Sequence, residues 1–136
     1  MKPRFDLSPI LILLVALPSI GVGVVSLFAP EFVAATVGFA FETPLGRSEI
    51  MTFYGGFYLG LGLFMLLGVF RPKLRYPLAI AMLFTAIPSV LARTASILVL
   101  RISDGTVFLL LGAELAYLAV GLALFLISRS KGPQGE

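Results

Sequence analysis

The chain lacks cysteine, histidine and tryptophan, and it has few charged residues. Without cysteine it has no disulfide, no thiolate nucleophile and no cysteine-based zinc or iron–sulfur site. Without histidine it has no imidazole base and no histidine ligand for haem. Charged residues make up 12% of its 136 residues and hydrophobic residues 59%, whereas soluble domains carry about 25% charged residues. This composition excludes a soluble enzyme, a nucleic-acid-binding protein and a disordered tail, and it indicates a membrane protein.

Four apolar runs predict four transmembrane helices, at residues 8–28, 50–70, 76–100 and 106–128. Each run has 21 to 25 residues, and a helix needs roughly 20 to cross a bilayer. The first run is expected to be retained, because no A-x-A cleavage site follows it. We therefore predict an all-α membrane protein, a single four-helix bundle domain over residues 1–136 that ends in a tail at 129–136.

The distribution of lysine and arginine predicts the topology. Seven basic residues fall on one side after four crossings: Lys2, Arg4, Arg71, Lys73, Arg75, Arg129 and Lys131. Arg47 and Arg101 fall on the other side. The positive-inside rule then predicts that both termini and the tail are cytoplasmic. The pI near 9.6 thus reflects insertion signals and contact with anionic lipid rather than a nucleic-acid groove.

The connection at residues 29–48 is the one long loop, and it is expected on the outer side. Pro30 and Glu31 favour a helix start, because proline suits the first turn and a carboxylate suits the positive end of the helix dipole. Phe32, Thr36 and Phe39 follow at helical spacing. A short interfacial helix and an ordered loop are both compatible with this pattern.

Glycines in the second apolar run are predicted to permit close helix packing. Gly55, Gly56, Gly60 and Gly62 lie within eight residues, and small residues let membrane helices approach one another. On a regular helical wheel Gly56 and Gly60 share a face, which predicts close contact between this pair and a neighbouring helix.

Two charged residues lie inside the predicted spans. Glu114 is eight residues into the fourth span, about 12 Å from its outer end at the helical rise. Arg93 is seven residues before Leu100, about 10 Å from the same surface. A charge in the bilayer is costly unless it is paired, so the matching depths predict an Arg93–Glu114 ion pair.

Other polar residues extend this pair to a predicted outer-leaflet cluster, whose members are Glu49, Ser89, Arg93, Asp104, Glu114 and Tyr117. One interpretation is a structural buttress that fixes helix register. The other is a site for a ligand or a proton, since ionisable groups within membranes are functional candidates. No motif for metal, nucleotide or acyl chemistry accompanies the cluster. We therefore predict no catalytic residue, no metal and no cofactor, although a lipid or quinone remains open as a ligand.

The run EIMTFYGGFYLGLGLF, from Glu49 to Phe64, resembles the second-helix signature of a family of small bacterial membrane proteins, domain of unknown function 4345. Arg93, the turn at Asp104-Gly105 and Glu114 match further landmarks of that family in the same order. The family is itself similar to the broader DoxX-like group. The resemblance implies a four-helix fold in a bacterial inner membrane and two landmark charges, but it implies no activity.

Three hypotheses of function follow. The first is an accessory or structural subunit that packs against a larger membrane complex or associates with itself, because the chain has short loops and Gly-rich helix faces. The second is a binder or carrier of an amphiphile such as a lipid or quinone, with the headgroup on the polar cluster. The third, an intramembrane enzyme that uses Glu114, has the weakest support. Membrane lipids are expected partners in every case, and nucleic acids in none.

Overall fold

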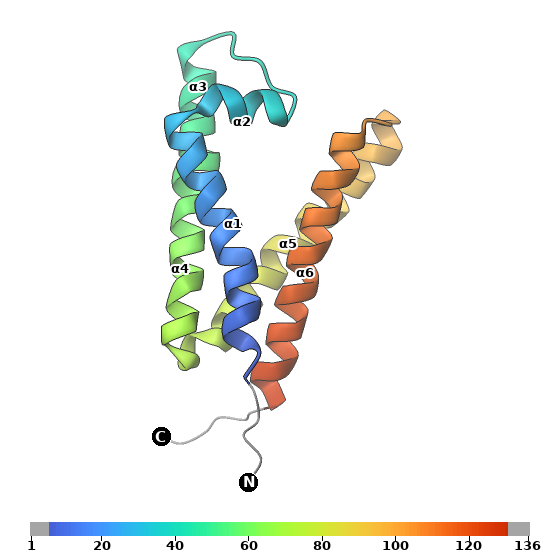
Figure 1. The fold of residues 1–136 in the computed structure, drawn as a ribbon. Coiled ribbons are helices and arrows are strands. Elements are labelled where there is room, and N and C mark those ends of the chain that lie inside the picture. Colours follow the sequence, from blue (N-terminus) through green and yellow to red (C-terminus); the bar gives the residue numbers. More distant parts are fainter. Residues whose placement is uncertain (1–5, 131–136) are drawn as a thin grey trace. The chain divides into compact units, whose positions relative to one another are not determined.

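The computed structural model describes residues 6–130, and every regular element in that range is a helix. The elements are α1 (Ser8–Phe28), α2 (Pro30–Thr36), α3 (Pro44–Ile50), the π-helix η1 (Met51–Phe57), α4 (Tyr58–Phe70), the 3-10 turn η2 (Pro72–Leu74), α5 (Arg75–Leu100) and α6 (Gly105–Ser130). Figure 1 shows their order along the chain. Four segments are long and apolar enough to cross a membrane: Ser8–Phe28, Pro44–Phe70, Pro72–Leu100 and Gly105–Ser130. The chain is therefore a multi-pass membrane protein.

The predicted spans agree with these helices, with two differences at their ends. The second helical segment begins at Pro44 rather than at residue 50, because α3, η1 and α4 follow one another without a break. The fourth helix continues through Arg129 and Ser130, which were predicted to belong to the tail. The rest of that tail, 131–136, lies outside the described residues, as do Lys2, Arg4 and Lys131.

The described chain forms two compact units. The hairpin unit comprises residues 6–11 and 71–130, and the α1–α4 unit comprises Ile12–Phe70. Many large apolar side chains point outward in both units, among them Phe84, Leu98 and Phe28, each more than 70% exposed. Exposed apolar surface of this extent is expected where lipid is the solvent.

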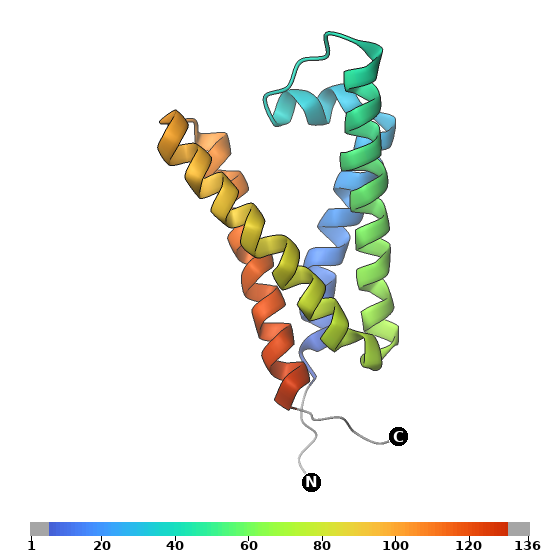
Figure 2. The same cartoon turned by 180° about the vertical axis from the view of Figure 1, so that it is seen from behind.

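In the hairpin unit, α5 and α6 lie side by side in both views of the ribbon (Figures 1 and 2). Their contact is close because Gly121 lies opposite Met82, where a Cβ atom on the glycine would be 3.1 Å from that of Met82. Leu78 and Leu124 are fully buried. Small-against-large packing of this kind is what associates helices in lipid.

A short turn joins α5 to α6. Arg101 ends α5 in the left-handed conformation, with φ 53°, and the N–H of Ile102 donates to the carbonyl of Ile97. Asp104 then caps α6, because its Oδ1 accepts a 2.6 Å hydrogen bond from the backbone N–H of Thr106. The turn brings the ends of two antiparallel helices together, so residues equally far from it lie at similar depth.

In the α1–α4 unit, α1 packs against η1 and α4 through alternating small and large residues. Leu27 of α1 lies opposite Gly55, Ile20 lies opposite Gly62, and Leu59 of α4 lies opposite Gly23. A Cβ atom on any of these three glycines would lie 2.5–2.7 Å from an atom of the facing helix. The three- and four-residue spacing on both helices is that of a coiled-coil seam.

This seam does not include Gly56 and Gly60. A Cβ atom at either position would meet no atom within 4 Å, so this pair does not pack against a neighbouring helix of the α1–α4 unit. Gly55 and Gly62 make the close contacts instead, because they are seven residues apart and therefore face the same side of the helix. The four glycines lie on two faces of the helix, and α1 packs against the face of Gly55 and Gly62. Contact of Gly56 and Gly60 with another helix stays a prediction.

The loop between α1 and α4 contains two short helices rather than one. α2 begins at Pro30 and ends before Gly38, whose positive φ of 81° reverses the chain. α3 begins after Thr43, whose hydroxyl accepts a 3.3 Å hydrogen bond from the N–H of Gly46. Figure 1 shows α2 lying across the same end of the α1–α4 unit that carries α3. The predicted helix is present, and an ordered segment follows it.

Candidate functional site

The predicted pair of charges is present in the hairpin unit. Nε of Arg93 on α5 donates a 2.8 Å hydrogen bond to Oε1 of Glu114 on α6, and Nη2 of Arg93 lies 2.7 Å from the same oxygen. The two side chains are 29% and 20% exposed. The other carboxylate oxygen of Glu114, Oε2, is buried without a hydrogen-bond partner among the described residues. The pair thus neutralises two charges that apolar surroundings would otherwise penalise.

Polar side chains near the pair are occupied by local contacts. Ser96 donates to the carbonyl of Arg93, and Thr85 donates to the carbonyls of Ala81 and Met82. The hydroxyl of Tyr117 lies 3.5 Å from that of Thr85. The contacts of Ser96 and of Thr85 with carbonyls are within α5, and the contact between Thr85 and Tyr117 joins α5 to α6.

No ion pair joins the Arg93–Glu114 pair to Glu49, Ser89 or Asp104 among the described residues. Asp104 caps α6. The side chain of Thr106 and, to a lesser extent, its backbone N–H donate hydrogen bonds that hold the pKa of Asp104 below its usual value. Ser89 is half-buried one helical turn before Arg93. Glu49 is exposed on α3, in the α1–α4 unit. Beyond the Arg93–Glu114 pair, the cluster stays a prediction.

A second ion pair, in which the arginine is buried and the carboxylate is partly exposed, was missed by the sequence analysis. Nη1 of Arg75 lies 2.6 Å from Oδ2 of Asp6, and the Arg75 side chain is only 9% exposed. The other oxygen of Asp6 accepts a hydrogen bond from the N–H of Ser8 at the start of α1. Arg75 was counted only as a loop cation, yet an acidic residue just before a helix start is a recognisable capping signal.

The α1–α4 unit carries two open pockets at the end that holds α2 and α3. The end pocket has a volume of about 630 Å³ and is lined by Leu27, Pro44, Arg47, Ser48, Met51, Thr52 and Gly56. The loop pocket has a volume of about 600 Å³ and is lined by Glu31, Ala34, Phe39, Ala40, Phe41, Glu42, Thr43, Pro44 and Arg47. Both volumes are typical of sites for small ligands. The sequence did not predict a pocket at these residues, although Glu31, Phe39, Thr52 and Gly56 indicated helix formation, polar support or packing.

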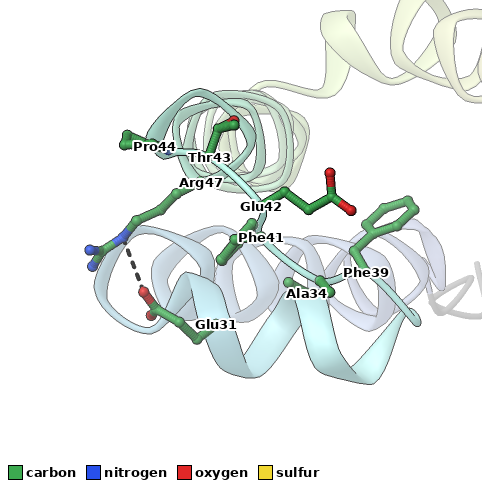
Figure 3. Close-up of a pocket in the computed structure, with 9 residues that line it drawn as sticks. Glu31, Ala34, Phe39, Phe41, Glu42, Thr43, Pro44 and Arg47 are labelled. Carbon is green, nitrogen blue, oxygen red and sulfur yellow. Dashed lines mark ion pairs between the residues drawn. The ribbon is translucent and has the colours of Figure 1, made fainter.

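Arg47 lines both pockets. Figure 3 shows its ion pair with Glu31 of α2, in which Nε of Arg47 lies 3.1 Å from Oε1 of Glu31. The side chains are 54% and 59% exposed, and an exposed pair of this kind adds little stability. Arg47 has further N–H donors in its guanidinium group, so it can bind an additional acceptor.

The end pocket has both polar and apolar lining residues. Arg47 and Ser48 of α3 and Thr52 of η1 supply a cation and two hydroxyls, and Leu27 and Met51 supply apolar walls. Gly56 leaves open space on the same helix, since a Cβ atom there would meet nothing within 4 Å. A polar group beside an apolar wall at the end of a transmembrane helix matches the layout of an amphiphile.

Metal chemistry has no support in the part of the chain that the structure describes. Residues 6–130 contain no group of three or more acidic residues placed to hold a metal ion. The carboxylates of Glu31 and Glu114 are each engaged with one arginine. The arrangement at both places is suited to binding or packing.

A comparison with protein families matches residues 7–126 to the family described as Domain of unknown function (DUF4345). The chain belongs to this family. The match includes α1, α4 and α5 in full and most of α6, and it contains Glu49, Arg93, Asp104 and Glu114. No curated protein and no solved structure matches the chain. The description of the family names no function.

Proposed function

We propose that this membrane protein binds an amphiphile in the end pocket. The observation that carries the proposal is the composition of that pocket, which combines Arg47, Ser48 and Thr52 with apolar walls. The amphiphile hypothesis of the sequence analysis is retained, but its headgroup site moves from Arg93 to Arg47. Arg93 is less suited to the task, because two of its nitrogens already contact Glu114.

A pair of glycine substitutions tests this proposal. Gly56 lines the end pocket, whereas Gly60 lines neither pocket, and both positions have open space for a side chain. Gly56→Leu should fill the pocket and reduce the amount of lipid or quinone that copurifies in mild detergent, as measured by mass spectrometry of the extract. Gly60→Leu should retain it. Equal retention by both variants would overturn the proposal.

The second candidate function is that of an accessory subunit, as proposed from the short loops and Gly-rich faces. The specific observation in its favour is that Gly56 and Gly60 lie open rather than packed within their own unit, since GxxxG faces bind other helices. This function predicts stoichiometric partner proteins or a second copy of the chain after mild extraction. It also predicts that Gly56→Leu and Gly60→Leu both release the partner, because both residues belong to the same face.

We further propose that the protein resides in a bacterial inner membrane with both termini in the cytoplasm. The support is the seven-to-two distribution of basic residues about the predicted spans. In this orientation α2, α3 and both pockets are extracytoplasmic, so an amphiphile would enter from the outer leaflet.

A further inference from the structure

The end pocket and the loop pocket adjoin, since both are lined by Pro44 and Arg47, but their charges differ. The end pocket contains one cation and no carboxylate. The loop pocket contains the carboxylates of Glu31 and Glu42 beside the same cation. Groups of both signs therefore border one continuous stretch of surface at this end of the α1–α4 unit.

The end pocket suits a phosphate. The guanidinium of Arg47 binds phosphate oxygens through charge-assisted hydrogen bonds, and the hydroxyls of Ser48 and Thr52 are further donors. Because Arg47 contacts Glu31 through Nε, its terminal nitrogens have donors to spare for a second anion.

The loop pocket suits a cation. Figure 3 shows the carboxylate of Glu42 on the same side of the loop as the ring of Phe39, and Glu31 lies near Arg47. Phe41 also lines this pocket. Carboxylates together with aromatic faces are the groups that bind ammonium ions in proteins.

The balance of charge disfavours a purely anionic ligand. Glu31, Glu42 and Arg47 sum to one negative charge, so a headgroup whose only charge is negative would bind Arg47 while two nearby carboxylates repel it. A headgroup with one phosphate and one ammonium group is complementary to Arg47 and Glu42. Because Glu31 is paired with Arg47 at 3.1 Å, Glu42 is the carboxylate of the loop pocket that an ammonium group would approach.

We infer that the two pockets together bind a zwitterionic phospholipid. Its phosphate lies at Arg47, Ser48 and Thr52, and its ammonium group lies at Glu42, beside the ring of Phe39. One acyl chain follows the apolar wall of Leu27 and Met51 toward Gly56. This inference rests on the proposed function and adds to it the class of amphiphile.

Native mass spectrometry of the full chain in a mixture of lipids tests the inference. The protein is mixed with equal amounts of phosphatidylethanolamine, phosphatidylcholine and phosphatidylglycerol, and the bound lipids are counted. We expect the two zwitterionic lipids to exceed phosphatidylglycerol by roughly tenfold, the effect of one charge-assisted hydrogen bond. A preference for phosphatidylglycerol would overturn the inference but leave the proposed function standing, whereas no bound lipid at all would overturn both.

Substitutions at Glu42 and Arg47, with Glu49 as a control, show whether a preference among the three lipids arises in these pockets. Glu42→Gln should remove the discrimination against phosphatidylglycerol, because it deletes a carboxylate that attracts the ammonium and repels the anion. Glu49→Gln is the matched control, since Glu49 is exposed on the adjoining α3 and lines neither pocket. Arg47→Gln should weaken all three lipids, which share the phosphate. If Glu42→Gln and Glu49→Gln select lipids alike, the ammonium does not bind in the loop pocket and the inference is wrong.

Discussion

At the scale of single residues, Arg93 and Glu114 illustrate how charge is tolerated between apolar helices. Each side chain is the ion-pair partner of the other through Oε1 of Glu114. The cost of an isolated charge near the bilayer centre is about 2.5–3.5 kcal/mol on insertion scales, so the pair is more favourable than two separate charges. Both residues nevertheless keep some exposure, which moderates the energy that their contact contributes.

A double-mutant cycle should detect this contact. Arg93→Met and Glu114→Gln should each lower the thermal stability of the purified protein in detergent, because each leaves one charge or one polar group without its partner. The double variant should recover part of the loss, with a coupling free energy of about 1 kcal/mol, the usual size for polar contacts between membrane helices. Strictly additive effects would contradict the ion pair.

Arg101 offers a stabilising substitution. Its left-handed backbone, φ 53° and ψ 42°, costs a non-glycine residue roughly 1 kcal/mol, and glycine adopts it freely. Arg101→Gly should therefore raise the free energy of unfolding by about 1 kcal/mol, measured by thermal unfolding in detergent. Arg101→Ala is the control, since it removes the charge and keeps the strain. If both variants raised the free energy of unfolding equally, the cause would be the loss of the arginine charge and not the relief of backbone strain.

At the scale of elements, the seam between α1 and α4 depends on glycines placed opposite large side chains. Gly23 accommodates Leu59, Gly55 accommodates Leu27, and Gly62 accommodates Ile20. The glycines on the two helices alternate with leucine and isoleucine at three- and four-residue spacing, so the helix backbones lie close together. The seam positions α3 and η1, and with them the end pocket.

A matched pair of alanine substitutions should separate seam glycines from open ones. Gly62→Ala places a Cβ atom 2.6 Å from Cγ1 and 2.9 Å from the backbone nitrogen of Ile20, which should destabilise the protein by about 1–3 kcal/mol through overpacking. Gly60→Ala meets no atom within 4 Å and should be neutral or stabilising by up to about 1 kcal/mol, because alanine is the better helix former. Thermal unfolding of both variants measures the difference. A larger loss at Gly60 would show that the open face is occupied in the native membrane.

At the scale of the whole molecule, four membrane crossings require both termini to lie on the same side. The basic residues that predict this side include Arg75, although its guanidinium is buried and paired with Asp6. The prediction is unaffected, because the positive-inside rule counts lysine and arginine rather than net charge.

Reporter fusions should establish this topology. A fusion at Glu136 should give a cytoplasmic signal, and an insertion near Gly38, in the loop after α2, should give an extracytoplasmic one. Signals from the same compartment at both positions would contradict four crossings, and exchanged signals would contradict the orientation.

Composition and the length of apolar runs determined by themselves that this is a four-span helical membrane protein, because a bilayer imposes both hydrophobicity and helix length. The Arg93–Glu114 contact was also predictable from the sequence. Because a short turn joins the two helices, the depth of each residue can be counted from that turn. The tertiary structure alone decided which glycines of α4 and η1 meet α1, because the choice between two glycine-rich faces depends on the large side chains of the other helix. The ion pair between Asp6 and Arg75, which are 69 positions apart, is likewise known only from the tertiary structure. The same holds for the ion pair of Glu31 with Arg47, which lies beside two pockets. Such contacts between distant segments depend on how the chain folds back on itself, and no local periodicity encodes them.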